Sequence, residues 1–261
     1  MKAVRILNSS AYEETLKNLS NYHKSIIYEI GQHFQFPNIA SNPFIALRKN
    51  VEIGFLASNL TGWEQEAVFQ YGKKHIYHEY YSIILNLAKT AIVPRKVLDY
   101  ACPIVYGHIF SPRYHKNMIY SFFVNFFAKP IFKNFNSGQA SLEQEIVAFI
   151  SGYFRKQNRY GPEQISVAIL EEQFITIMIS GLLSPFLRSF IQADSQESAV
   201  IEKIFMIQAE MVLGELLHKY FHAELEEGEP FIFFDKATDK LIILSPLSSQ
   251  QWSAFLDNMN A

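Results

Sequence analysis

Apolar and polar positions form regular blocks along the second half of the chain, and these blocks predict a sequence of structural elements. A helix is predicted to start at Ser141, which forms a capping box with Gln144. The apolar positions of this helix recur at helical spacing: Leu142, Ile146, Phe149, Ile150 and Tyr153.

Two antiparallel strands are predicted to follow this helix. Residues 165–170 and 174–183 are largely β-branched or aliphatic, and a short polar turn separates them. Gly161, which can take a positive φ, and Pro162, which cannot continue a helix, mark the break before the first strand. Ser184 and Pro185 suit the cap and the first turn of another helix.

A long helix and a final hairpin complete the second half. The polar segment "QADSQES" predicts a break between two helical stretches, and Met206 and Met211 are expected in the core of the second one. The apolar stripe of that helix is predicted to contain Ile201, Ile204, Phe205, Ala209, Val212, Leu216 and Tyr220. The hairpin pairs "PFIFF" with "KLIIL", and a short terminal helix capped by Ser248 or Ser249 follows it.

The first half repeats this order of segments. "FIALRKNVEIGFLASNLT" predicts a hairpin, a helical stretch follows, and "YGHIFSPRYHKNMIYSF" predicts another hairpin. A constant offset of 123 residues, without a gap, relates Leu60 to Leu183, Ile84 to Ile207, Glu79 to Glu202, Ile109 to Ile232, Phe110 to Phe233, and Ile119 to Ile242. The shared order and spacing predict a tandem duplication.

The predicted fold class is α+β. Each copy has the order α-β-β-α-β-β, and its simplest packing is a four-stranded, mostly antiparallel sheet with helices on one face. We therefore expect two domains, with residues 1–125 as a divergent first repeat and residues 136–261 as the second repeat and its terminal helix.

The net charge of −2 conceals an asymmetry between the two halves. Residues 1–130 contain 14 Lys and Arg against 8 Asp and Glu, whereas residues 131–261 contain 9 against 17. Opposite charges are expected if the halves pack together or descend from a homodimer, and drift on solvated surfaces is the alternative. The basic residues are scattered rather than clustered, so no nucleic acid is expected as a partner.

Composition indicates a globular cytoplasmic protein. Hydrophobic residues make up 49% and charged residues 18%, and the single cysteine, Cys102, cannot form a disulfide within the chain. The start of the sequence has no apolar core of signal-peptide length. The most apolar segment, residues 118–132, is too short to span a membrane; it is expected to be a strand and linker, with an interfacial membrane contact as the alternative.

Few residues occur in a pattern that catalysis or metal binding requires. Two groups have the helical spacing of metal ligands, namely Glu215 with His218 and His222, and His75 with His78 and Glu79. Neither group is accompanied by further ligands. His218 and His222 also suit the C-terminal end of a helix, where they interact favourably with its dipole, and the spacing of the second group also suits an exposed helix face. No metal and no cofactor is therefore expected, and the absence of a nucleophile motif or phosphate loop argues against an enzyme.

The segment "RYGPEQISVAILEEQFITIMISGLLSP" resembles the MpsC-like family, a component of a sodium-translocating system that generates membrane potential. The residues that match the family pattern are Arg159, Gly161, Pro162, Gly181, Leu183, Ser184 and Pro185. An acidic residue often follows the Ser/Thr-Pro pair in the family, whereas Phe186 and Leu187 stand here. The resemblance covers residues 141–246 and implies a non-enzymatic accessory protein of a membrane transport system for cations or inorganic carbon.

Three functions remain open from the sequence. The first is a non-catalytic interaction or regulatory protein, cytoplasmic or peripheral at the inner face of the membrane, with a protein partner such as a membrane transport complex. The second is a small-molecule sensor or enzyme with a pocket between the repeats, where the polar candidates are His108, Arg113, His115 and Lys116. The third is a building block that self-associates through exposed sheet edges.

Overall fold

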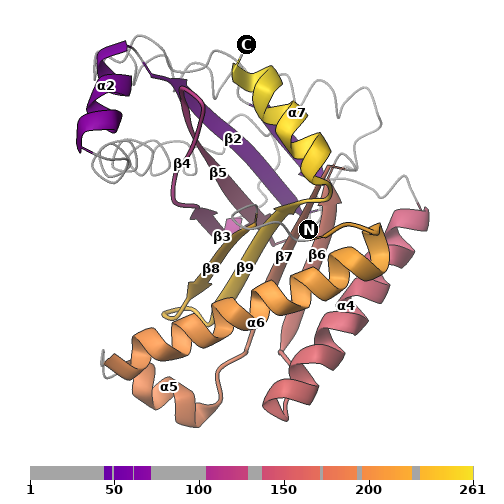
Figure 1. The fold of residues 1–261 in the computed structure, drawn as a ribbon. Coiled ribbons are helices and arrows are strands. Elements are labelled where there is room, and N and C mark those ends of the chain that lie inside the picture. Colours follow the sequence, from indigo (N-terminus) through magenta and orange to yellow (C-terminus); the bar gives the residue numbers. More distant parts are fainter. Residues whose placement is uncertain are drawn as a thin grey trace, which may run out of the picture. The chain divides into compact units, whose positions relative to one another are not determined.

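The computed structural model is an α+β protein with two antiparallel sheets (Figure 1). It describes residues 44–48, 50–60, 62–71, 104–128, 137–170, 173–192, 196–224 and 230–260. The chain divides into two compact units, Met1–Asn134 with Phe255–Ala261, and Phe135–Ala254. The end of the terminal helix thus belongs to the first unit, whereas we expected all of residues 136–261 in the second.

The sheet of the first unit is built from two hairpins. The first hairpin pairs β1 (Phe44–Arg48) with β2 (Val51–Asn59), and helix α2 (Gly62–Tyr71) follows it. The second contains β3 (Ile104–Ile109), the short β4 (Arg113–His115) and β5 (Met118–Phe127). Strand β5 pairs with β2, β3 and β4, and all ten of its residues are buried.

The sheet of the second unit follows the same plan. Helix α4 (Ser137–Asn158) leads into the hairpin β6 (Gln164–Leu170) and β7 (Phe174–Ser180). Helices α5 (Pro185–Gln192) and α6 (Gln196–Phe221) connect it to the hairpin β8 (Phe231–Asp235) and β9 (Lys240–Pro246). The terminal helix α7 (Ser249–Asn260) comes last. The predicted order of elements is therefore present in this half.

Four strands of each sheet follow the same order, and β4 adds a fifth strand to the first sheet, where four were expected. The orders are β1-β2-β5-β3 and β6-β7-β9-β8, so each hairpin of one sheet corresponds to a hairpin of the other. The pairing of Val51 with Phe126 corresponds to that of Phe174 with Pro246, which sets an offset of 123 residues in one strand and 120 in the other. The gapless match of Ile119 with Ile242 is therefore wrong, because the β3–β5 connection is three residues longer and contains β4.

The core of the second unit lies between one face of its sheet and helices α4 and α6, which cross that face in Figure 1. The sheet contributes alternate residues, such as Ile175, Ile177 and Ile179 on β7, because neighbouring side chains on a strand point to opposite faces. Residues of the other face, including Thr176 and Met178, are buried as well.

Three local expectations were wrong. Helix α4 begins at Ser137, so Ser141 lies inside the helix rather than at its cap. Among the described residues Gly181 is the only glycine with a positive φ; after α4 it is Arg159, with a φ of 65°, that takes the left-handed conformation common just past a helix end. Strand β7 ends at Ser180 rather than at residue 183, because the next amides bond elsewhere, as described below.

Helix α6 is apolar on two sides. Its stripe against the sheet contains Ile201, Phe205, Ala209, Val212 and Leu216, as predicted. Ile204 and Met211 were expected in the same core but are exposed. At 100° per residue they point away from the buried stripe, so the sequence pattern merged two separate faces into one.

Helix α7 contributes residues to both units. Trp252 is buried and meets Phe174 of the second sheet edge-on, with 6.0 Å between ring centroids. Phe255 makes a similar contact with Phe55 of the first sheet at 5.1 Å. The amide of Trp252 donates to the carbonyl of Ser248, which confirms that the helix begins at this serine pair.

Candidate functional site

The motif residues Gly181 to Pro185 form the link between β7 and α5. Gly181 has a φ of 75°, a conformation that residues with a side chain rarely adopt. Ser184 caps α5, because its Oγ accepts a hydrogen bond from the amide of Leu187 at 3.1 Å. Pro185 opens the helix, where its missing N–H costs no hydrogen bond.

A single carboxylate, that of Asp239, organises this link. Its Oδ1 accepts from the amides of Leu182 and Leu183, both at 3.1 Å, and its Oδ2 accepts from Leu183 at 3.2 Å and from Arg188 Nη2 at 2.9 Å. Its carbonyl also accepts from the amide of Gly181 at 3.3 Å. Asp239 thus ties the turn before β9 to the start of α5.

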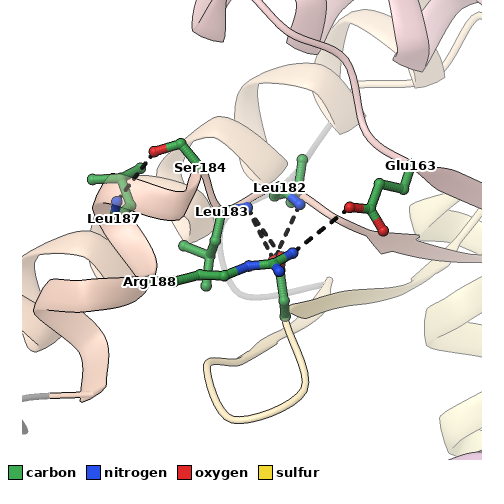
Figure 2. Close-up of polar contacts among 7 residues, drawn as sticks. Glu163, Leu182, Leu183, Ser184, Leu187 and Arg188 are labelled. Carbon is green, nitrogen blue, oxygen red and sulfur yellow. Dashed lines mark hydrogen bonds and ion pairs between the residues drawn. The ribbon is translucent and has the colours of Figure 1, made fainter.

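Arg188 extends this arrangement to the start of β6. Figure 2 shows the amides of Leu182 and Leu183 and the guanidinium of Arg188 converging, with Glu163 on the far side of the guanidinium. Glu163 Oε1 lies 3.7 Å from Arg188 Nη2. We call Asp239, Leu182, Leu183, Arg188 and Glu163 the Asp239 cluster. The Asp239 side chain is only 11% exposed, so water screens these contacts weakly.

The Asp239 cluster has a positional role. Free amides just before a helix can bind an anion, but here the protein's own carboxylate already occupies those of Leu182 and Leu183. The guanidinium of Arg188, on the first turns of α5, is held by the same carboxylate. The Asp239 cluster therefore fixes the direction of α5 relative to the end of β7.

Sequence reasoning identified one side of this cluster and missed the other. Gly181, Leu183, Ser184 and Pro185 were singled out, whereas Asp239 was treated as part of a hairpin turn. The residue type offers one local signal, because Asp tolerates the left-handed region better than most residues. Asp239 does adopt this conformation, with a φ of 52°. The other family-motif residues, Arg159, Gly161 and Pro162, lie in the loop between α4 and β6.

We expect Gly181→Ala to destabilise the second unit by about 1–2 kcal/mol. The left-handed backbone disfavours a Cβ, and that Cβ would also collide with the side chain of Glu163. Gly152→Ala is the matched control: Gly152 lies in α4 with nothing within 4 Å of an added Cβ, so alanine should raise stability by about 0.5–1 kcal/mol. Urea unfolding of both variants measures the difference, and two shifts of the same sign would contradict the expectation.

A buried polar pair lies in the first sheet. Glu52 on β2 and Asn125 on β5 are directly opposite in the ladder, and Asn125 Nδ2 donates to Glu52 Oε2 at 2.9 Å. Both residues are at most 5% exposed. Burial raises the pKa of Glu52 to about 6, although the hydrogen bond from Asn125 opposes this effect. Asn125 Oδ1 accepts no hydrogen bond from the described part of the chain.

The four polar candidates of the first unit are only partly brought together. His115 Nε2 and Lys116 Nζ both contact Asp257 Oδ1 of α7, at 3.0 and 2.6 Å. These contacts lower the pKa of Asp257, with the hydrogen bond from Lys116 as the largest cause. The ring of His108 instead meets Phe110 edge-on at 4.9 Å, and Arg113 lies opposite Tyr120 in the ladder. Asp257 was not foreseen, because it lies 141 residues from Lys116.

The histidine groups considered as metal ligands give no site in the described part of the chain. His218 lies in α6, but His222 follows the end of that helix with a φ of 51°, so the two do not continue one helical face. No group of three or more His, Cys, Asp or Glu among the described residues could hold a metal ion. His75, His78, Glu79, Ile84 and Cys102 lie outside the described residues.

Comparison with protein-family models, with curated proteins and with solved structures found no match to the chain. Within the described residues, no helix combines the length and the apolar character needed to cross a membrane.

Proposed function

We propose that this protein is a non-catalytic accessory protein of the MpsC-like type, which acts by binding another protein at the cytoplasmic face of a membrane transport system. The proposal rests on what the motif residues do in the structure. The residues from Gly181 to Pro185 serve to hold α5 in place, and α5 presents two exposed aromatic rings.

The anchoring of α5 leaves one side of the helix free for a partner. Ile191 is buried and Leu187 packs against the core, while Arg188 is bound to Asp239. On the other side Phe186 is 69% exposed and Phe190 36% exposed, and their rings meet edge-on at 4.9 Å. Paired aromatic rings on a rigid support are typical anchors of protein interfaces, because they bury much apolar area with little loss of entropy.

The shared strand order of the two sheets supports a tandem duplication as the origin of the architecture. The offset is 123 residues between β2 and β7 and 120 between β5 and β9, so a single three-residue difference in chain length relates the two sheets. In this proposal the second unit keeps the family motif, and the first unit has diverged in charge and in aromatic content.

Crosslinked pull-down from the native cells, separated into membrane and soluble fractions, tests the proposal. We expect the wild-type protein to recover subunits of a membrane transport system, and Phe186→Ser with Phe190→Ser to reduce that recovery about tenfold, the loss of one or two interface anchors. Tyr160→Ser, which removes another exposed aromatic ring of the same unit, is the control and should leave recovery unchanged.

Two outcomes would contradict the proposal. Recovery of the bait alone from both fractions would favour the alternative, a small-molecule sensor or enzyme with a pocket between the repeats. Equal loss in the Tyr160 control would show that exposed aromatic residues bind membranes or proteins without selectivity.

A further inference from the structure

A second apolar stripe runs along the exposed side of α6. Its members are Val200, Ile204, Ile207 and Met211, which are 58%, 47%, 46% and 53% exposed. We call these four residues the α6 seam. Their spacing of four, three and four residues places them on one line along the helix. The core stripe of the same helix, which includes Phe205, Ala209 and Val212, lies on the opposite side.

The α6 seam has the pattern of a helix-pairing surface. A helix at the surface of a monomer is usually polar on its outer side, whereas the alternation of three and four residues is that of the a and d positions in a coiled coil. Large apolar side chains that gather on one exposed face indicate an interaction surface rather than chance exposure. The stripe spans about 16.5 Å at 1.5 Å per residue, so about three helical turns on each side can interlock.

We propose that the α6 seam pairs in antiparallel fashion with the same seam of a second copy of this chain. The argument for this occupant is the charge along one edge of the seam, where Lys203 and Glu210 lie seven residues apart. An antiparallel pair related by a two-fold axis brings equal edges together, so Lys203 of each copy lies near Glu210 of the other. The interface is then self-complementary in both shape and charge.

The opposite edge of the seam excludes the parallel alternative. In a parallel pair the edge of one copy that contains Lys203 and Glu210 faces the opposite edge of the second copy, which contains Glu215. Glu210 of one copy would then lie against Glu215 of the other. Two carboxylates in contact repel each other, whereas the antiparallel pair makes two attractive contacts. Among the described residues neither Lys203 nor Glu210 forms an ion pair within its own chain, so both are available to the second copy.

A charge exchange tests the pairing with the full-length protein. We expect sedimentation equilibrium to show a dimer, and Lys203→Glu or Glu210→Lys to raise its dissociation constant about tenfold each, because each single change places like charges together. The double variant K203E/E210K restores opposite charges and should return the dissociation constant to within about threefold of wild type. Ile207→Glu should leave a monomer that unfolds at the same temperature as the wild-type monomer, compared at protein concentrations below the dissociation constant, since Ile207 does not support the core.

The possible failures are distinct. A monomer at every concentration, or a dimer that the double variant does not restore, would overturn the proposal. If Ile207→Glu instead unfolded at a lower temperature than the wild-type monomer at the same low concentration, the seam would be covered by another part of the same chain. Phe186→Ser with Phe190→Ser should keep the dimer, so loss of partner binding in that variant tests the proposed function independently of the dimer.

Discussion

Replacement of Asp239 by alanine is expected to lower the free energy of unfolding of the second unit by about 4 kcal/mol. The change leaves the buried amides of Leu182 and Leu183 without their acceptor, and each such donor left unpaired costs about 1–3 kcal/mol. The half-exposed guanidinium of Arg188 also loses its ion pair with Asp239 but keeps water and Glu163 as neighbours. Alanine is also less tolerant than aspartate of the left-handed backbone at this position, where φ is 52°.

Two further variants separate these contributions. Asp239→Asn keeps the tolerance for the left-handed conformation and one acceptor oxygen but loses the charge, so we expect a loss of about 2 kcal/mol. Asp235→Ala is the control from the same hairpin: its carboxylate accepts hydrogen bonds from Ala237 and Thr238 of the exposed turn, and its removal should cost under about 1 kcal/mol.

Urea unfolding together with hydrogen exchange of the α5 amides measures the effect of the Asp239 variants. The Asp239→Ala protein should exchange the amides of residues 186–192 faster than wild type, because the carboxylate holds the start of α5. An alanine variant as stable as the Asp235 control would show that the Asp239 cluster does not support the fold.

Replacement of Glu52 by glutamine is expected to stabilise the first unit at pH 8 and to have no effect at pH 4. The pKa of Glu52 is raised from 4.5 to about 6 in the folded protein, so the folded state resists ionisation more than the unfolded state does. Below pH 4.5 the carboxyl is neutral in both states and its full stability is present. As the pH rises through 6, Glu52 ionises in the folded protein as well and this contribution to the free energy of unfolding, about 2 kcal/mol, is lost.

Glutamine removes the charge and keeps the shape. Its Oε1 can accept from Asn125 as Glu52 does, and its amide can donate to Asn125 Oδ1. Glu66→Gln on the exposed side of α2 is the control for the loss of a surface carboxylate and should change stability by under about 0.5 kcal/mol. The measurement is thermal unfolding from pH 4 to pH 8, taken as the difference between variant and wild type. If the glutamine variant were less stable than wild type at pH 8, the folded protein would stabilise the ionised form of Glu52, which contradicts the prediction.

Much of the fold follows from local sequence signals. Runs of β-branched and aliphatic residues predicted the strands from 165 to 170 and from 174 onward, and the Ser184-Pro185 pair predicted the start of α5. Those predictions succeeded because strand composition and helix capping depend on residues that are close together in the sequence. The start of α4 was missed because the helix continues through residues 137–140 before the Ser141 signal.

The candidate sites were much less predictable. Asp239 and Leu183 are 56 residues apart, and Glu52 and Asn125 are 73 apart. In each case one partner looks ordinary in its own segment: Asp239 looks like a turn residue, and Glu52 looks like the solvent side of an alternating strand. Their pairing comes from the register between strands, which a single local pattern does not encode.

What the sequence by itself determined is the kind of each segment: strands in hairpins, helices between them, and an α+β class. What only the tertiary structure decided is which side of each segment is buried. Helix α6 illustrates the reason, because Ile204 and Phe205 are equally apolar and adjacent, yet only Phe205 faces the sheet. Burial is set by the neighbours that a side chain meets in space, so composition alone could not separate the core stripe from the α6 seam.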